Sequence, residues 1–313
     1  MSFSVEVKRE IITTPSAPCC QRAELSAFLH INSNLVISNR TMNIKIEIEN
    51  ATIAKHLFSA LKDRYRVDID LSVEKKQNLR KNNVYILTVK EKAIEILEDL
   101  GIYTSKGMRH TPSAVITLKD CCAKSYLSGA FLASGSINAP TTPNYHLEIS
   151  SQDEELSESI LELVNRFDLE AKMIQRRNRF VVYIKAADKI ADFLRLIKAY
   201  NNTMTFEDER IQRDFRNSLT RLDNVGVANE VKSIKAGSAQ LDAIYLLIEH
   251  NRYNHLEDRL MRVGDLRMNN PEASLNELLE IYEEEHGETL SKSGLQHRFK
   301  KIMDLASKIG DIK

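Results

Sequence analysis

The sequence has no excess charge of either sign. It contains 44 basic and 44 acidic residues, so its formal net charge is zero. This balance excludes a bulk electrostatic attraction to nucleic acid or to an anionic membrane. If the protein binds nucleic acid, positive charge must therefore be concentrated on one part of its surface.

Long apolar runs are also missing. Residues 1–12 include four charged side chains between Glu6 and Glu10, where a secretion signal needs an unbroken apolar stretch. The longest apolar run, Ala243 to Ile248, is far shorter than the roughly 20 residues that span a bilayer. We therefore expect a soluble, cytoplasmic protein with no membrane partner.

Cysteine is scarce and unusually spaced. The four cysteines form two adjacent pairs, Cys19-Cys20 and Cys121-Cys122, instead of the CxxC or CxxxxC spacings that bring two thiolates to one zinc ion. A zinc site with two ligands from each pair is one interpretation. The pattern favours the other, in which the thiols are buried at helix starts. We therefore predict no metal and no cofactor.

At 313 residues, with 42% hydrophobic residues, the chain is longer than one core usually grows and should form two or more domains. An internal repeat divides its first part. Leu25 to Leu29 follows the first cysteine pair, and the similar Leu127 to Leu132 follows the second at an offset of 102 residues. A repeat of this length predicts two copies of one structural unit.

Both halves show the same order of helix, strand, helix, hairpin and closing helix. In the first half, the strand, second helix, return strand and closing helix are expected at 44–48, 53–65, 84–89 and 92–100. In the second half they are expected at 145–149, 156–167, 180–184 and 187–199. The pattern predicts a duplicated mixed α/β domain over 1–203, with halves at about 1–103 and 104–203 and one face of its sheet in solvent.

The first helix of each half resembles a known motif. Leu127 to Gly135 resembles the LAGLIDADG motif of homing endonucleases, and Leu25 to Ser33 is a weaker copy. In that family two such helices pack through small residues, and each ends in an acid that holds a divalent metal at the scissile phosphate. Here Asn32 and Ser134 occupy the acid positions, so neither copy offers the anionic oxygen that a hard cation requires. The resemblance implies a nuclease-like scaffold without catalytic residues; core helices of an ordinary α/β protein are the alternative, which the duplication disfavours.

Each predicted hairpin has a basic tip that could contact DNA phosphates in a two-fold saddle. These secondary contacts are Lys75, Lys76, Arg80, Lys81, Arg176, Arg177 and Arg179. Hairpin tips are also often charged only because they are solvated. The saddle could equally bind a protein or a small ligand.

Residues 204–238 change in character and predict a helical connector, with Gly226 and Gly237 near its expected breaks. Residues 239–313 then predict an all-α domain. Its helices are expected at 241–250, 256–268, 275–285 and 292–308. The third has a capping box, Ser274 to Glu277, and ends at Gly287.

The fourth predicted helix begins at Ser291 and has two distinct faces. Its apolar stripe for the core is Leu295, Phe299, Ile302 and Ala306. Its remaining surface offers Lys292, Ser293, Gln296, His297, Arg298, Lys300 and Lys301. No acid interrupts this stretch, whereas residues 201–313 as a whole contain 16 basic and 20 acidic residues. A recognition helix for the DNA major groove needs this local charge, although a solvated amphipathic helix would also show it.

Three segments resemble the WhiA family: Arg216 to Lys232, Asn270 to Leu278 and Leu290 to Arg298. The resemblance implies an α+β fold, with a duplicated LAGLIDADG-like domain, a helical connector and a helix-turn-helix domain. It also implies a nucleoid-associated regulator of transcription, active in cell division, chromosome segregation or sporulation, that binds double-stranded DNA and another transcription factor or RNA polymerase. The alternatives are an active homing-type endonuclease and a protein-interaction scaffold.

Overall fold

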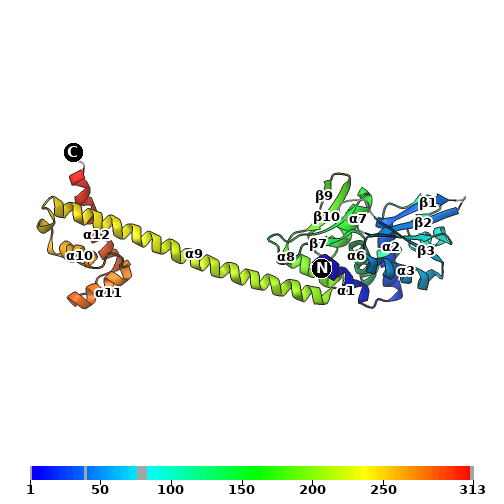
Figure 1. Cartoon of the computed structure of the whole chain (residues 1–313), viewed down its shortest axis with the longest axis horizontal. Helices are drawn as coiled ribbons and strands as arrows, with labels where there is room; N and C mark the ends of the chain where they lie inside the picture. Colours follow the sequence, from blue (N-terminus) through cyan, green and yellow to red (C-terminus); the bar gives the residue numbers. More distant parts are fainter. Residues whose placement is uncertain (1, 39–40, 76–82, 311–313) are drawn as a thin grey trace. The chain divides into compact units, whose positions relative to one another are not determined.

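The computed structural model describes residues 2–38, 41–75 and 83–310 (Figure 1). Contacts within the chain divide it into two compact units, 1–213 and 214–313. No helix of the described ranges is both long enough and apolar enough to traverse a lipid bilayer.

The N-terminal unit contains two copies of the same arrangement. The first is α2 (Pro18–Asn32), β1 (Ser33–Ser38), β2 (Thr41–Ile48), α3 (Ala51–Tyr65), β3 (Ile69–Lys75), β4 (Asn83–Val89) and α4 (Ala93–Asp99). The second is α6 (Asp120–Ser134), β7 (Ser136–Ile137), β8 (Leu147–Ser151), α7 (Glu154–Asn165), β9 (Lys172–Arg176), β10 (Arg179–Ile184) and α8 (Ala187–Leu196). Between them lie the small hairpin β5 (Tyr103–Thr104) and β6 (Gly107–Met108) and the short α5 (Ala114–Thr117).

Strand order confirms the duplication predicted from the sequence. One antiparallel sheet has the order β1-β2-β4-β3 and the other the order β7-β8-β10-β9. In the first, Ile44, Ile46 and Ile48 of β2 are buried, and the intervening Lys45 and Glu47 point to the opposite face. The alternation therefore gives each sheet one core face and one outer face.

Helices α2 and α6 lie side by side at the centre of the N-terminal unit (Figure 1). Small residues permit this close approach: a Cβ atom added to Gly129 would lie 2.1 Å from the backbone oxygen of Glu24. Buried Leu25, Phe28 and Leu127 fill the space beside that contact. The predicted packing of the two motif helices is confirmed, and it joins the two halves in one core.

A helix that the sequence reading did not predict begins the chain. Helix α1 (Phe3–Thr13) buries Phe3, Val7 and Ile11, which recur every four residues. That spacing was visible in the sequence, but the charged residues between these positions obscured it.

The connector is one continuous helix, α9 (Tyr200–Glu249), and the breaks expected at Gly226 and Gly237 do not occur. A glycine costs a helix only about 1 kcal/mol, which packing at its ends can outweigh. Gly237 allows close packing, because an added Cβ would lie 3.3 Å from the backbone oxygen of Pro271. The helix expected at 241–250 is the last part of α9 rather than a separate element.

The C-terminal unit adds three helices to the end of α9. They are α10 (Asp258–Asn269), α11 (Leu275–His286) and α12 (Lys292–Gly310), and a 3-10 turn, η1 (Tyr253–His255), precedes them. They pack against one another around Phe299, Leu278 and Val263, all of which are buried. This small core fixes which face of α12 remains in solvent.

Candidate nucleic-acid interface

Capping residues define both ends of α11 and the start of α12. Ser274 and Glu277 form the predicted capping box at the start of α11, and Gly287 ends that helix in the left-handed conformation, with φ of 64°. The Ser291 hydroxyl accepts a hydrogen bond of 3.1 Å from the Gly294 backbone N–H at the start of α12. The cap therefore fixes where α12 begins.

The predicted apolar stripe of α12 is buried and sets the orientation of the helix. Its four residues are the core residues Leu295, Phe299, Ile302 and Ala306. The opposite face of the first turns is exposed, and its side chains are Lys292, Ser293, Gln296, His297 and Lys300. Three of these can donate or accept hydrogen bonds at a base edge, and the two lysines can neutralise phosphates.

The other two predicted recognition residues have partners within the protein. Arg298 is half-buried and donates a hydrogen bond of 3.1 Å to the Tyr282 hydroxyl. The Nζ atom of Lys301 lies 2.7 Å from a carboxylate oxygen of Glu257, which holds the pKa of Glu257 below its ordinary value. Lys300 has no ion pair among the residues that the structure describes. The candidate interface is therefore the exposed face of α12 that contains Lys300.

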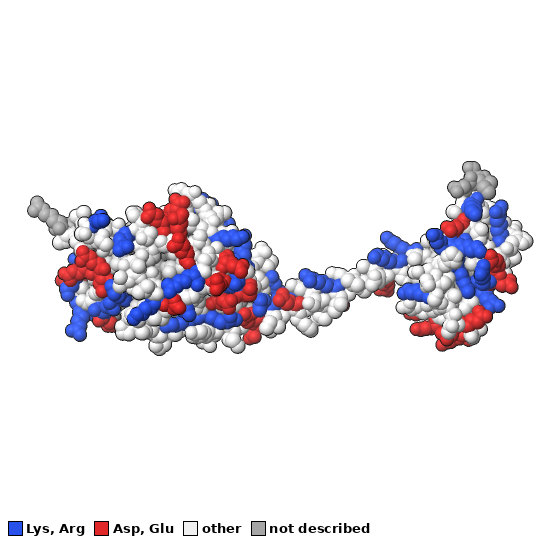
Figure 2. All heavy atoms as spheres, turned by 180° about the vertical axis from the view of Figure 1, so that it is seen from behind, with Lys and Arg blue, Asp and Glu red and all other residues white. Residues whose placement is uncertain are grey.

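Acidic residues of this unit gather on the preceding helix. Glu283, Glu284 and Glu285 are all exposed on α11, and residues 287–291 connect that helix to α12. A connection of this length exceeds the usual 3–4 residues of a helix-turn-helix turn. Figure 2 shows Lys and Arg next to Asp and Glu on the face of the C-terminal unit that it draws.

Four of the seven predicted hairpin contacts lie in the described residues. Arg176, Arg177 and Arg179 lie at the exposed tip of the β9–β10 hairpin, and Lys75 is exposed at the end of β3. Lys76, Arg80 and Lys81 lie outside the described residues. Arg177 has a φ of 54°, which is consistent with a tight turn between two paired strands.

The outer faces of the two sheets differ in charge. On the first sheet, strand pairing places Lys45 on the same face as three acids, which are Glu47, Asp70 and Glu74. On the second, it places Glu148 on the same face as three basic residues, which are Lys172, Arg176 and Arg179. For the strand residues described here, only the second half therefore has the charge needed to attract a phosphate backbone.

The two residues that the motif resemblance assigns to the acid positions, Asn32 and Ser134, make hydrogen bonds within the protein. The side-chain amide of Asn32 donates a bond of 3.0 Å to the Ala133 carbonyl oxygen. The Ser134 hydroxyl accepts a bond of 3.2 Å from the Ser150 backbone N–H. Neither side chain carries the negative charge with which a carboxylate binds a divalent ion.

A buried arginine that sequence reasoning missed braces the C-terminal unit. Arg267 of α10 is 2% exposed and donates hydrogen bonds of 3.0 Å to the Gln240 side chain and 2.6 Å to the Ala273 carbonyl oxygen. Its guanidinium also lies 5.4 Å from the ring centroid of Phe299 in α12. The signal in the sequence was a charged residue in line with the apolar stripe of Leu260 and Val263.

The fold defines a class of protein in which a duplicated LAGLIDADG-like domain is joined to a helix-turn-helix domain. Profiles of three domains match the chain: "WhiA N-terminal LAGLIDADG-like domain" at 18–103, "WhiA LAGLIDADG-like domain" at 123–216 and "WhiA C-terminal HTH domain" at 219–306. The chain is 44% identical over 311 residues to a "Probable cell division protein WhiA" of Bacillus cytotoxicus, which covers 99% of this chain and 97% of that protein. The chain therefore belongs to the WhiA family.

Solved structures show the same fold. Full-length WhiA from Thermatoga maritima superposes with a TM-score of 0.61 at 23% identity, covering 98% of this chain and 99% of that one. A crystal structure of the N-terminal LAGLIDADG domain of WhiA superposes with a TM-score of 0.51 at 24% identity, covering 63% and 90%. The first of these likenesses extends through both units of the chain.

Proposed function

We propose that this protein binds double-stranded DNA in a sequence-dependent manner through the exposed face of α12 and thereby regulates transcription. The curated relatives are named as cell division proteins, and we extend that role to this chain as control of genes for cell division, chromosome segregation or sporulation. Such a protein acts at the nucleoid in the cytoplasm. RNA polymerase or another transcription factor is the protein partner that this role requires.

One observation carries the proposal: the exposed face of α12 combines lysines with uncharged hydrogen-bonding side chains. Gln296 can make paired hydrogen bonds to adenine, and Lys292 and Lys300 can contact the phosphates beside it. The chain as a whole has no net charge, so this concentration is not a consequence of composition. An α-helix fits the major groove, where each base pair presents a distinct pattern.

The N-terminal unit, in this proposal, contributes a weaker and asymmetric grip. The basic outer face around Arg176 and Arg179 would contact phosphates without reading bases. The matching face of the first half would contribute less, because acids outnumber basic residues among its described strand residues. We further propose that this unit does not cleave DNA, because Asn32 and Ser134 cannot hold a metal ion at the scissile bond.

Binding measurements on substitutions in one helix test the proposal. The chain is first used to select preferred sequences from genomic fragments, and affinity for the selected DNA is then measured over a range of salt concentrations. We expect Lys300→Ala to weaken binding to all sequences and to reduce the slope of log K against log salt concentration by about 0.9. We expect Gln296→Ala to lose about 1–3 kcal/mol of discrimination between sequences.

The matched control is Lys308→Ala, which removes an exposed lysine from the far end of α12. It should leave the salt dependence and the sequence preference nearly unchanged. If Lys300→Ala and Gln296→Ala both bind as the wild type does, α12 is not the recognition helix. If the immobilised protein retains acidic proteins but no DNA at low salt, an interaction scaffold is favoured instead. Reproducible nicking of plasmid DNA in the presence of magnesium would favour an endonuclease.

A further inference from the structure

All four cysteines of the chain meet at one point. The Sγ atoms of Cys19, Cys20, Cys121 and Cys122 lie within 4.8 Å of one another. None is in a disulfide; Cys19 and Cys121 are exposed, and the other two are buried. This cluster lies at the ends of α2 and α6 opposite to Asn32 and Ser134, so it is separate from the positions of the nuclease acids.

The duplication explains how two distant pairs become one cluster. Each pair occupies the second and third positions of its helix, since α2 begins at Pro18 and α6 at Asp120. Helices α2 and α6 pack closely against each other, and Gly129 of α6 lies against the backbone of Glu24 in α2. Equivalent positions of the repeat are therefore brought face to face, and each half contributes one exposed and one buried thiol.

The spacing of the sulfur atoms matches that of a mononuclear metal site. A zinc ion with four thiolates at about 2.3 Å has sulfur atoms about 3.8 Å apart. The Sγ atoms of Cys121 and Cys122 are 3.9 Å apart, and all four Sγ atoms lie within 4.8 Å of one another. We propose that the four cysteines bind one Zn²⁺ ion in a tetrahedral site that joins the two halves of the N-terminal unit.

The surroundings favour thiolates over thiols once an ion is bound. The four cysteines lie in the first turns of two helices, where the positive dipole ends favour thiolates over thiols. Lys119 and Arg22 line the same surface pocket as Cys19 and Cys122, which adds positive charge beside a site whose net charge would be −2. None of the described residues that line that pocket is an Asp or a Glu.

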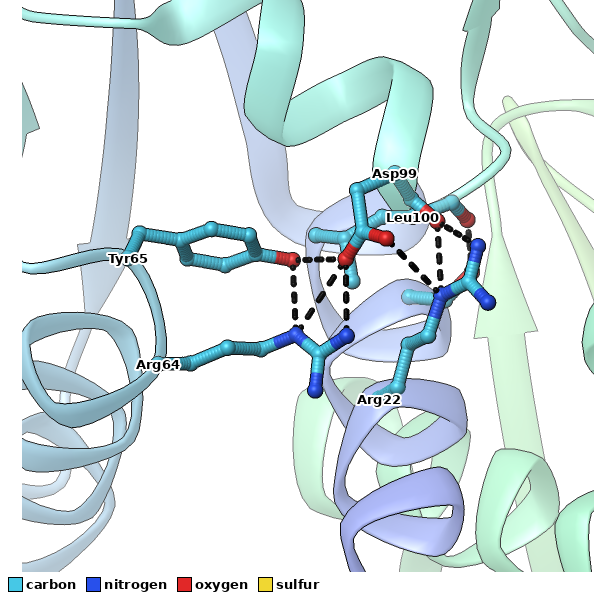
Figure 3. Close-up of polar contacts among 6 residues, drawn as sticks. Arg22, Arg64, Tyr65, Asp99 and Leu100 are labelled. Carbon is cyan, nitrogen blue, oxygen red and sulfur yellow. Dashed lines mark hydrogen bonds and ion pairs between the residues drawn. The ribbon is translucent and has the colours of Figure 1, made fainter.

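A hydrogen-bonded cluster holds Arg22 in this place (Figure 3). Its guanidinium donates to the Asp99 backbone oxygen at 2.8 Å and lies 3.3 Å from the Asp99 carboxylate. Arg64 and Tyr65 bind the same carboxylate at 2.9 and 2.8 Å. Partial burial acts to raise the pKa of Asp99, but the hydrogen bonds from Tyr65 and Arg64 hold it below its ordinary value. The carboxylate is thus engaged by its own partners.

Metal binding would couple the four thiols to folding. Cys20 and Cys122 are buried and Cys19 and Cys121 are exposed, so a bound divalent cation would link the core to the surface of the N-terminal unit. Because an assembled site exists only in the folded protein, zinc should stabilise the N-terminal unit.

Cobalt is a suitable spectroscopic probe for this site. The full chain, without a histidine tag, is reduced, freed of metal and titrated with Co²⁺. We expect one ion per chain, with intense visible bands of tetrahedral cobalt and a near-ultraviolet thiolate-to-cobalt band. One equivalent of Zn²⁺ should abolish both. We also expect zinc to raise the Tm of the N-terminal unit.

Substitution of the two exposed cysteines tests the ligand assignment without disturbing the core. Cys19→Ser combined with Cys121→Ser should lower zinc affinity by more than the 10–100-fold typical of changes around a metal site. The metal-free variant should melt as the metal-free wild type does, but zinc should no longer raise its Tm. Gln21→Ser, an exposed change beside Cys20, is the matched control and should retain wild-type zinc binding.

Three results would overturn the proposal. One is a reduced chain that takes up no cobalt or zinc. A second is a double variant that binds zinc as tightly as the wild type. The third is a disulfide between the two cysteine pairs that forms in the presence of excess zinc.

Discussion

At the residue scale, two basic side chains show how burial changes what a charge does. Arg267 is buried but donates hydrogen bonds to Gln240 and Ala273, and these bonds offset the cost of burying its charge. Lys8 of α1 faces the ring of Phe131 at 5.6 Å, and burial lowers its pKa to about 8. Arg267 therefore stabilises the C-terminal unit, whereas burial of Lys8 imposes a desolvation cost on the N-terminal unit.

Replacing Arg267 should be strongly destabilising. Arg267→Met keeps most of the apolar stem but leaves the Gln240 amide oxygen and the Ala273 carbonyl oxygen without their donor. We expect the free energy of unfolding of the C-terminal unit to fall by about 2–3 kcal/mol. Urea titration followed by circular dichroism measures it, with the exposed Arg262→Met as control; equal losses for the two variants would contradict the role given to Arg267.

Replacing Lys8 should have the opposite effect. At pH 7 Lys8 is charged in both the folded and the unfolded state, so the folded state bears the burial cost; Lys8→Met should therefore stabilise the N-terminal unit by about 1–2 kcal/mol. In the unfolded chain Lys8 has its ordinary pKa of 10.5, so above pH 8 the folded protein releases this proton before the unfolded chain does. The advantage of the variant should thus shrink between pH 8 and 10.5. A constant difference across that range, in parallel thermal melts, would show that Lys8 is not buried as a cation.

The pair of Lys301 and Glu257 gives a third prediction at this scale. Glu257→Gln releases Lys301 from its ion pair and removes a negative charge beside the proposed DNA surface. We expect tighter DNA binding and a salt slope steeper by up to about 0.9, if Lys301 then meets a phosphate. Glu272→Gln removes an equal charge from another exposed position of the unit and should have a smaller effect. If the two variants change DNA affinity equally in a fluorescence anisotropy titration, DNA binding depends only on the net charge of the unit.

At the scale of elements, the sequence was most informative where a pattern is local. The repeat offset, the strand alternation of Ile44 to Ile48 and the capping box at Ser274 all depend on neighbouring residues, and all are confirmed. The cysteine cluster could not be found in this way, because its two pairs are adjacent only across the α2–α6 contact. The continuity of α9 was also missed, since packing at Gly237 involves a residue far along the chain.

The contact between α2 and α6 can be tested by adding one methyl group. Gly129→Ala would place a Cβ atom 2.1 Å from the Glu24 backbone oxygen, and backbone atoms cannot yield as a side chain does. We expect a loss of about 1–3 kcal/mol or more in the N-terminal unit. Gly226→Ala in α9 has nothing within 4 Å of the added atom and should instead stabilise its helix by up to about 1 kcal/mol. If Gly129→Ala is tolerated as well as Gly226→Ala in thermal melts, the helices do not pack as described.

At the scale of the whole molecule, a family resemblance in a few segments predicted both the scaffold and the helix-turn-helix domain. The resemblance did not say which side chains of the recognition helix are available. Arg298 and Lys301 have the residue type and spacing of DNA contacts, yet each has a partner within the protein. Nor did it show that the two sheets differ in charge, because that depends on which strand residues share a face.

The central claim is that α12, and not the saddle, lies in the major groove. Photocrosslinking addresses it directly: a selected DNA fragment containing iododeoxyuridine is irradiated with the full chain, and mass spectrometry locates the attached residues. We expect the substituted bases to attach to residues 292–300 of α12, and we expect the β9–β10 hairpin to contact only the DNA backbone. Attachment to bases by the sheets of the N-terminal unit, with none in α12, would contradict it.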